Sequence, residues 1–291
     1  TKLCPDLKDK QKYVCSLKNL QLYLEHGLIL KSIHRVLAAD QSDFVKPYID
    51  FNSMKRQQAK SNFEKDFFKF ANNSIYGKFI ESLRNRTNVE VVKDEKRARK
   101  LTSKPKFIGF QILDEDITVV QTKKKTLTLN KPIVCGFAVL ENAKHIMGSF
   151  WYDVLKPKYN DKIRLLLSDT DSFIYGVYTE DSYQDLFNIK DFMDLSGYNK
   201  STPLGRFADP SNKKIPGKFS DEKPTEIINE VISLKPKMYS ILTEKLICKT
   251  GGTESSHKCL ASCKLGGSIT AKGISKTAQK GISHEDYRMV L

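Results

Sequence analysis

The sequence predicts an α+β fold, with helices and antiparallel strands in different parts of the chain. Apolar residues recur at helical spacing through most of the first third and again over residues 136–154. The second half carries pairs of short strand-like runs, one pair joined by an acidic turn. With 291 residues and 40% hydrophobic side chains, the chain can build one large or two modest domains with a real core.

The N-terminal part is expected to be helical. Leucines at helical spacing over residues 17–37, interrupted by a glycine, predict two short helices. A turn is expected at Lys46-Pro47. Asn52 or Ser53 is a favourable cap for the long helix that should follow, which is expected to run to about Leu83.

Residues 84–131 have a different character and predict an inserted hairpin or small subdomain. They contain a basic cluster at 93–100, an acidic triplet at 114–116 and an alternating stretch from Thr122 to Asn130.

The second half is expected to supply a sheet backed by a helix over residues 136–154. Ile163 to Leu167 and Phe173 to Tyr178 should form two strands joined by the acidic tip 168–172. A loop, two further strands and a Gly-, Ser-, Lys- and Thr-rich stretch are then expected at residues 196–224, 226–234, 238–243 and 251–280. A short helical tail should end the chain.

The charge favours a polyanionic partner. The chain has 49 basic and 34 acidic residues, a net charge of +15. The surplus lies in residues 1–100 (21 basic, 12 acidic) and 201–291 (15 and 9), around a neutral centre (13 and 13). Two basic segments on either side of a segment with acidic catalytic residues would suit a protein that binds nucleic acid, because basic side chains neutralise phosphates. Without a long apolar run or a secretory signal, we expect an intracellular protein with no membrane partner.

The six cysteines do not follow the spacing of a disulfide framework, which indicates reduced thiols, as in an intracellular protein. Four residues near the C-terminus, Cys248, His257, Cys259 and Cys263, contain zinc-ligand types but no paired CxxC. The spacing therefore does not favour a zinc site.

The acidic tip is the first candidate site. Asp169 and Asp171 are one residue apart in a segment expected to be extended, so their carboxylates should project on the same face. Two carboxylates at such a short distance repel each other unless a divalent cation lies between them. Mg²⁺ bound by carboxylate oxygens is what phosphoryl transfer requires. The alternative is a hairpin turn rich in the usual turn residues.

A stripe of polar side chains on the long helix is the second candidate site. At about 100° per residue, five side chains share a stripe roughly 80° wide: Asn62, Lys65, Lys69, Asn73 and Tyr76. Two lysines four residues apart repel unless an anion such as a triphosphate neutralises them. Phe63, Phe67 and Phe70 are expected to point inward. The alternative is a solvated lysine face.

Three motifs resemble those of family B DNA polymerases, in the same order. Lys69 to Gly77 matches K-x3-N-S-x-Y-G, Ser168 to Ser172 is similar to D-T-D-S, and Lys237-Met238-Tyr239 is similar to K-x-Y. The sequence around His34-Arg35 and at residues 63–68 and 217–222 resembles that of the protein-primed branch found in viruses and Maverick/Polinton transposons.

The resemblance implies a polymerase right hand with helical fingers and an antiparallel-sheet palm. It implies the following division: 1–85 fingers region with adjoining palm helices, 86–131 an inserted β-rich subdomain, 132–250 palm and 251–291 the start of the thumb. In that branch the insertion is linked to processive synthesis and strand displacement. The implied setting is a eukaryotic nucleus or a site of viral replication.

The same resemblance implies a role for each candidate residue. Lys69 and Lys65 would neutralise the phosphates of an incoming dNTP, with Asn73, Tyr76 and Gly77 around its sugar and base. Asp171, with Asp169 as the weaker ligand, would bind catalytic Mg²⁺, of which the complete enzyme uses two ions. Lys237 and Tyr239 would hold the primer terminus of a DNA primer-template. A terminal protein is the implied primer in this branch.

The sequence also departs from the family. The upstream D-x-x-S/N-L-Y-P motif, which carries a further metal-binding Asp, does not occur, and neither do the exonuclease motifs. Residue 168 is Ser where Gly or Thr is usual. We therefore expect these residues alone to be inactive or very weak as a polymerase.

Two other functions are open at this point. A haloacid-dehalogenase-type phosphohydrolase also uses an Asp-x-Asp pair after an apolar strand, but Ser172 and Phe173 follow here where Thr or Val is expected, and Lys69 to Gly77 would be unused. A non-catalytic DNA-binding remnant of a mobile element would use the same basic surface. A reverse transcriptase is disfavoured because its acidic pair is adjacent.

Overall fold

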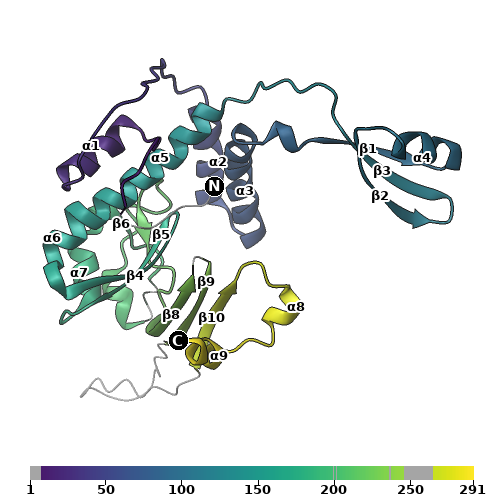
Figure 1. The fold of residues 1–291 in the computed structure, drawn as a ribbon. Helices are drawn as coiled ribbons and strands as arrows, with labels where there is room; N and C mark the ends of the chain where they lie inside the picture. The colour runs from purple at the N-terminus through teal and green to yellow at the C-terminus, as the bar shows by residue number, and fades with distance from the viewer. Residues whose placement is uncertain (1–7, 199, 201, 236, 246–264) are drawn as a thin grey trace.

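The computed structural model describes residues 8–245, apart from 199, 201 and 236, and residues 265–291. It confirms the α+β fold class: a main body of helices and mostly antiparallel sheets, with a small subdomain on a long connection (Figure 1). The helices are α1 (Leu17–Glu25), α2 (Lys46–Gln58), α3 (Asn62–Phe79), α4 (Glu95–Thr102), α5 (Ile133–Ser149), α6 (Lys156–Tyr159), α7 (Ser182–Asn188), α8 (Lys276–Gln279) and α9 (His284–Val290). The strands are β1 (Thr87–Val92), β2 (Phe107–Asp114), β3 (Ile117–Lys123), β4 (Ile163–Asp169), β5 (Ser172–Val177), β6 (Met193–Asp194), β7 (Phe219–Ser220), β8 (Glu226–Lys235), β9 (Met238–Lys245) and β10 (Leu265–Ala271).

Only one of the two helices expected over residues 17–37 forms. Ser16 caps α1, and Gly27, with a left-handed φ of 90°, follows its end. Residues 28–43 form neither helix nor strand. The later apolar residues of this stretch, such as Ile33 and Leu37, are exposed, so no packing stabilises a second helix there.

The long helix expected up to Leu83 is two helices, α2 and α3. The predicted turn at Lys46-Pro47 is wrong, because Pro47 lies in the first turn of α2, where its missing N–H costs nothing. Asn52 and Ser53 lie inside α2 and cap nothing. The helix that carries the lysine stripe begins instead at a capping box, in which Ser61 and Glu64 satisfy each other's backbone N–H groups.

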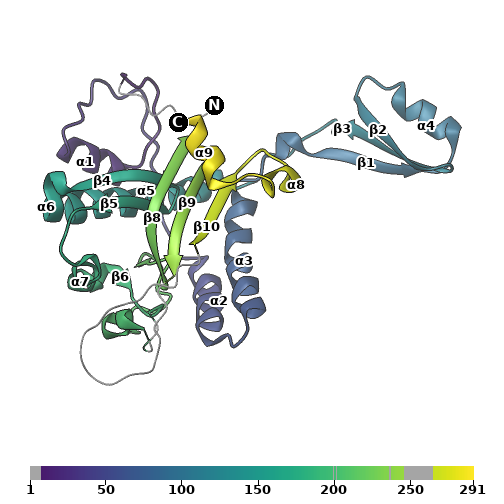
Figure 2. The same cartoon turned by 90° about the horizontal axis from the view of Figure 1, so that it is seen from below.

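Residues 87–123 form the small subdomain. A three-stranded antiparallel sheet of order β1-β3-β2 is covered by α4, and Val92, Leu101 and Val120 form its own buried core. The acidic triplet supplies the turn between β2 and β3, but the alternating stretch expected up to Asn130 is a strand only as far as Lys123. Figures 1 and 2 show this subdomain projecting from the main body.

The main core lies beneath the β4–β5 hairpin. After α5 the chain continues through a π-helical segment, Phe150–Leu155, whose Phe150, Trp151 and Leu155 are buried. The Trp151 ring lies 5.6 Å from that of Phe173 on β5, which fixes the hairpin against the helix. The predicted helix and both strands around the acidic tip are confirmed.

The second sheet of the main body has the order β10-β9-β8 and is antiparallel throughout. The strands expected at 226–234 and 238–243 are present as β8 and β9. β10 pairs with β9, so residues 265–271 belong to the same sheet as residues expected in the palm. The group Cys248, His257, Cys259 and Cys263 lies outside the described residues. Among the helices in the described ranges, none is long and apolar enough to span a membrane.

Candidate functional site

The acidic tip is a two-residue turn between β4 and β5. Asp169 pairs with Ser172 across the hairpin, so Thr170 and Asp171 form the turn itself. The Asp171 N–H donates to the Asp169 carbonyl at 2.6 Å, and the Ser172 hydroxyl donates to the same carbonyl at 3.2 Å. Thr170 adopts φ 56°, a left-handed conformation that is unusual for a β-branched residue.

Asp169 and Asp171 therefore do not share a strand face, which corrects that prediction. It required an extended backbone from 169 to 171, whereas β4 ends at Asp169 and the chain reverses at Thr170. Asp169 is partly buried and Asp171 is exposed at the tip. The two carboxylates thus occupy different environments, although they belong to one turn.

A second tight turn carries the lysine of the K-x-Y motif. Lys237 precedes β9 and has a left-handed φ of 61°. Its carbonyl accepts a hydrogen bond from the N–H of Lys272, the residue after β10, at 3.0 Å. Tyr239 lies two residues on, in β9, paired with Ser233 on one side and Thr270 on the other.

The two turns meet through an ion pair. The Lys237 ammonium lies 2.5 Å from Oδ1 and 2.7 Å from Oδ2 of Asp169, although the two residues are 68 positions apart in the chain. Hydrogen bonding from Lys237 lowers the pKa of the Asp169 carboxyl despite its partial burial, and Thr170 and Lys272 act in the same direction. Two of the three motifs therefore converge in space.

Backbone strain accompanies this convergence. Non-glycine residues with left-handed φ cost free energy and are retained where the surrounding structure enforces them, often at functional sites. Thr170 and Lys237 both adopt this conformation, one at each of the two contacting turns. Nothing in the sequence reveals these two conformations, because neither residue type favours them.

The lysine stripe lies on α3, as expected from the helical spacing. Lys65, Lys69 and Asn73 are exposed and Tyr76 is partly buried. A Cβ added to Gly77 would meet no atom within 4 Å, so the described chain does not itself require glycine there. Within the described ranges, no hydrogen bond or ion pair joins this stripe to Asp169 or Asp171.

The three phenylalanines expected to point inward are exposed, which corrects that prediction. Their exposed fractions are 79% for Phe63, 55% for Phe67 and 70% for Phe70. α3 packs against α2 and α5 with other sides, so nothing in the described chain covers this face. The prediction assumed that every apolar helix face is covered by its own chain.

The acidic tip fits a divalent cation in donor type but does not form a complete site. Carboxylate oxygens are the ligands that Mg²⁺ prefers. The Asp171 side chain has no partner among the described residues, whereas both oxygens of Asp169 contact Lys237. No group of three or more His, Cys, Asp and Glu side chains able to hold a metal gathers in the described ranges.

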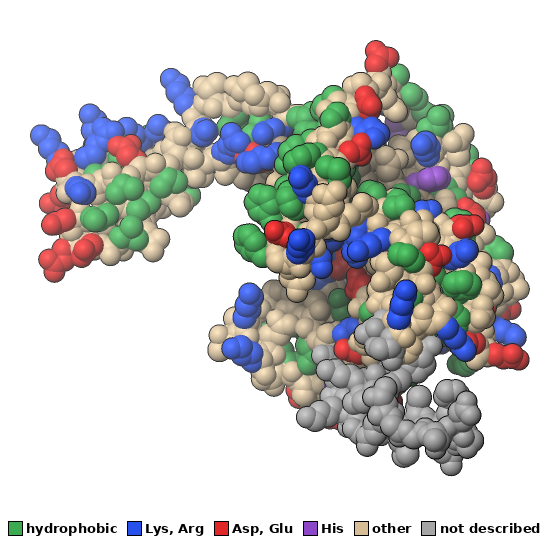
Figure 3. Space-filling model, turned by 180° about the vertical axis from the view of Figure 1, so that it is seen from behind, with side chains coloured by type: hydrophobic (Ala, Val, Ile, Leu, Met, Phe, Trp, Pro, Cys, Tyr) green, Lys and Arg blue, Asp and Glu red, His purple; other side chains and the backbone are tan. Residues whose placement is uncertain are grey.

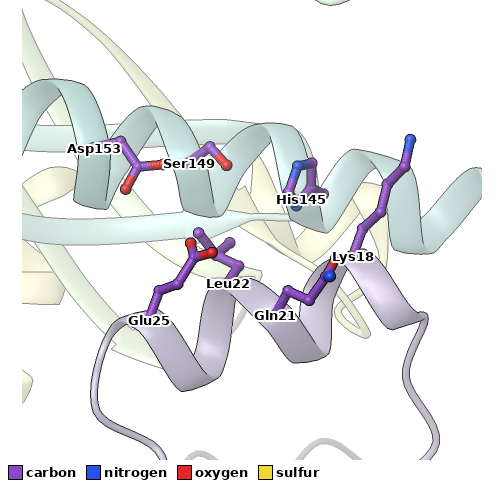
Figure 4. A pocket seen from close by; sticks show the side chains of 7 residues that line it. All are labelled: Lys18, Gln21, Leu22, Glu25, His145, Ser149 and Asp153. Carbon is purple, nitrogen blue, oxygen red and sulfur yellow. The ribbon is translucent and has the colours of Figure 1, made fainter.

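A separate cavity of about 390 Å³ lies between α1 and α5. Figure 4 shows the side chains that line it, which come from both helices and from the π-helical segment after α5: Lys18, Gln21, Leu22, Glu25, His145, Ser149 and Asp153. Asp153 is also paired with His26, at 2.9 Å. None of the residues predicted for the candidate site lines this cavity.

No protein-family model and no curated protein matches this sequence. Among solved structures, the chain is similar to "Phi29 DNA polymerase complexed with single-stranded DNA", with 18% identity and a TM-score of 0.48. It is also similar to the same polymerase in a post-translocation binary complex with primer-template DNA, with 18% identity and a TM-score of 0.47. Each match covers 85% of this chain and 34% of the other chain, so this chain spans about a third of their length.

Proposed function

We propose that this chain carries the nucleotide-binding and primer-binding part of a template-directed DNA polymerase. The observation that carries the proposal is the ion pair between Asp169 and Lys237, because it joins the D-T-D-S and K-x-Y motifs at one place. The exposed lysine stripe on α3 and the net charge of +15 suit the phosphates of a dNTP and of a DNA primer-template.

The metal-binding role falls first on Asp171, the exposed carboxylate at the tip. Asp169 would become a second metal ligand only when Lys237 releases one of the two carboxylate oxygens of Asp169. Mg²⁺, when bound, would offset the negative charge of the nucleotide phosphates. Because the described carboxylates do not complete a metal site, the remaining ligands must come from outside them.

The other roles follow from position and chemistry. Lys65 and Lys69 would pair with the nucleotide phosphates, and Asn73 and Tyr76 on the same stripe would contact its sugar and base. The open space above Gly77 would leave room for the nucleotide. Lys237, released from Asp169, would be free to pair with a phosphate at the primer terminus, next to Tyr239.

Nucleotide binding tests the lysine stripe. Lys69→Gln should weaken dATP binding in the presence of Mg²⁺ by about tenfold or more, because a charge-assisted contact to phosphate is lost. Isothermal titration calorimetry on this chain measures the change. The matched control is Lys96→Gln, an exposed lysine in α4, which should leave the dissociation constant unchanged.

Metal binding tests the acidic tip. Asp171→Asn should weaken Mn²⁺ binding measured by electron paramagnetic resonance, whereas the control Asp161→Asn, an exposed carboxylate outside the tip, should not. If neither Lys69→Gln nor Asp171→Asn has an effect, while DNA binding remains salt-sensitive, the non-catalytic DNA-binding function replaces the proposal.

The phosphohydrolase alternative is disfavoured because it uses only the acidic tip. Ser172 and Phe173 follow the two aspartates where that family has Thr or Val, and the lysine stripe on α3 would have no role. Hydrolysis of para-nitrophenyl phosphate that disappears in Asp169→Asn would reverse this preference.

A further inference from the structure

A third tight turn lies beside the ion pair between Asp169 and Lys237. It follows β10 and comprises residues 271–274, with the Ile274 N–H donating to the Ala271 carbonyl at 3.3 Å. Gly273 takes the third position with a left-handed φ of 98°, which a type II turn requires and which glycine adopts without strain. Lys272 takes the second position and is exposed.

The backbone ties Lys272 to the turn of the K-x-Y motif. Its N–H donates to the Lys237 carbonyl at 3.0 Å, and the preceding residue, Ala271, pairs with Met238 on β9. The pKa of the Asp169 carboxyl is lowered first by the hydrogen bond from Lys237, and the positive charge of Lys272 lowers it further. Lys272 therefore lies where two of the motifs meet, although it belongs to neither of them.

The two lysines at this place differ in how available their charges are. The Lys237 ammonium contacts both carboxylate oxygens of Asp169, at 2.5 and 2.7 Å. Lys272 has no ion-pair partner among the residues that the structure describes. An anion can therefore pair with Lys272 without breaking an existing contact, whereas Lys237 must first leave Asp169.

The charge of the surrounding segment indicates the kind of anion. Residues 265–283 contain three lysines and no acidic residue: Lys272, Lys276 and Lys280. None of the three forms an ion pair within the described ranges. Figure 3 shows basic side chains around α8 and on the neighbouring side of the main body. Successive unpaired lysines suit a chain of phosphates, as in a nucleic-acid backbone, better than one small anion.

We propose that Lys272 binds a backbone phosphate of the primer strand near its 3′ end. The turn at 271–274 fixes the backbone of Lys272, and its unpaired ammonium contacts the phosphate. The inference rests on the proposed function, because that function assigns the primer terminus to Lys237 and Tyr239. It adds a DNA-binding residue that lies outside all three motifs.

The first test measures binding of a primer-template duplex with a 5′ overhang to this chain by fluorescence anisotropy. Lys272→Gln should lower the affinity by about fivefold to tenfold, because a charge-assisted contact is lost. It should also reduce the magnitude of the slope of log K against log salt by about 0.9, the value for one phosphate of a duplex. Lys272→Arg keeps the charge and should restore both values.

The matched control is Lys162→Gln. Lys162 is an exposed lysine just before β4, at the end of that strand far from Asp169. This variant should bind the duplex with the affinity and salt slope of the wild type. Circular dichroism checks that each variant is folded.

The second test locates the phosphate. A neutral methylphosphonate is placed at one position at a time along the last few nucleotides of the primer strand. At the contacted position it should weaken binding by the wild type but not by Lys272→Gln, because the variant has already lost that contact. If every primer position affects the two proteins equally, Lys272 binds none of these phosphates and the proposal is wrong.

Binding of dATP separates this proposal from the proposed function. Lys272→Gln should bind dATP in the presence of Mg²⁺ with the wild-type affinity. If this variant loses affinity for dATP and not for the duplex, Lys272 belongs to the nucleotide site and the proposal is overturned. If the wild type binds the duplex through Lys272 but does not bind dATP, the proposed function is overturned and the phosphate contact stands.

Discussion

At the scale of single residues, three aspartates of this chain show how the surroundings of a carboxylate determine what it can do. Asp171 is exposed and unpartnered among the described residues, which suits a ligand for a cation. Asp169 is bound by Lys237, which lowers its pKa. Asp221 is partly buried, and desolvation raises its pKa, although the Lys223 N–H and the Tyr198 hydroxyl donate hydrogen bonds to it. The sequence alone makes the three equivalent.

Asp221→Asn should raise the melting temperature near pH 7 by about 2 °C. The pKa of Asp221 in the folded chain lies above its ordinary value of 3.8. The folded state therefore binds the proton more tightly than the unfolded state, and the free energy of unfolding falls as pH rises from 3.8 through the folded pKa. Above that range the buried charge is a constant penalty, which asparagine removes. The gain should therefore be complete at pH 7 and vanish below pH 3.8.

Calorimetric melts of Asp221→Asn at several pH values test this expectation. Asp161→Asn, at an exposed position, should leave the melting temperature unchanged over the same range. A lower melting temperature for Asp221→Asn at neutral pH would mean that its hydrogen bonds to the ionised form outweigh the cost of burial.

At the scale of elements, the sequence predicted best where apolar residues follow a regular helix or strand spacing. The strands on both sides of the acidic tip, the helix over 136–154 and the helical nature of α3 were all predictable from apolar spacing. The break between α2 and α3 was missed, because the sequence from 52 to 79 keeps its helical character across it. The capping box at Ser61 and Glu64 could have located it.

The junction of α3 and α5 depends on a close approach that only glycine permits. A Cβ added to Gly136 in α5 would lie 2.1 Å from Cγ2 of Ile80, just after α3. Gly136→Ala should therefore destabilise the chain by about 1–3 kcal/mol, because the two elements must move apart. Urea unfolding followed by circular dichroism measures the loss.

Gly77→Ala is the matched control, since it lies in a helix with no atom within 4 Å of the added Cβ. It should stabilise the chain by about 0.5–1 kcal/mol, the usual preference for alanine over glycine in a helix. An equal effect of the two substitutions would contradict the close packing at Gly136.

At the scale of the whole molecule, the chain consists of a main body and a subdomain with separate cores. The main core centres on Trp151, Leu155 and Leu195, whereas the subdomain has its own core around Val120. Thr87 and Lys123 pair at the base of the subdomain, so its two ends lie next to each other. This geometry allows an insertion without disturbing the chain around it.

Replacing residues 88–122 with Asn-Gly, a two-residue hairpin turn, should leave the main body folded. Its melting temperature should stay within about 2 °C of that of the full chain, because no residue of its core is removed. Differential scanning calorimetry on both chains measures this. A large drop, or loss of cooperative melting, would show that the subdomain supports the main body.

The sequence by itself determined the fold class and most individual elements, and it located the three motifs on which the proposed function rests, because helix and strand periodicity and turn residues act between near neighbours. Tertiary structure decided which motifs meet. It placed Lys237 on Asp169 and added β10 to the sheet of β9, and the described residues leave Phe63, Phe67 and Phe70 on α3 exposed. These outcomes depend on contacts between residues far apart in the chain, and local spacing contains no record of such contacts.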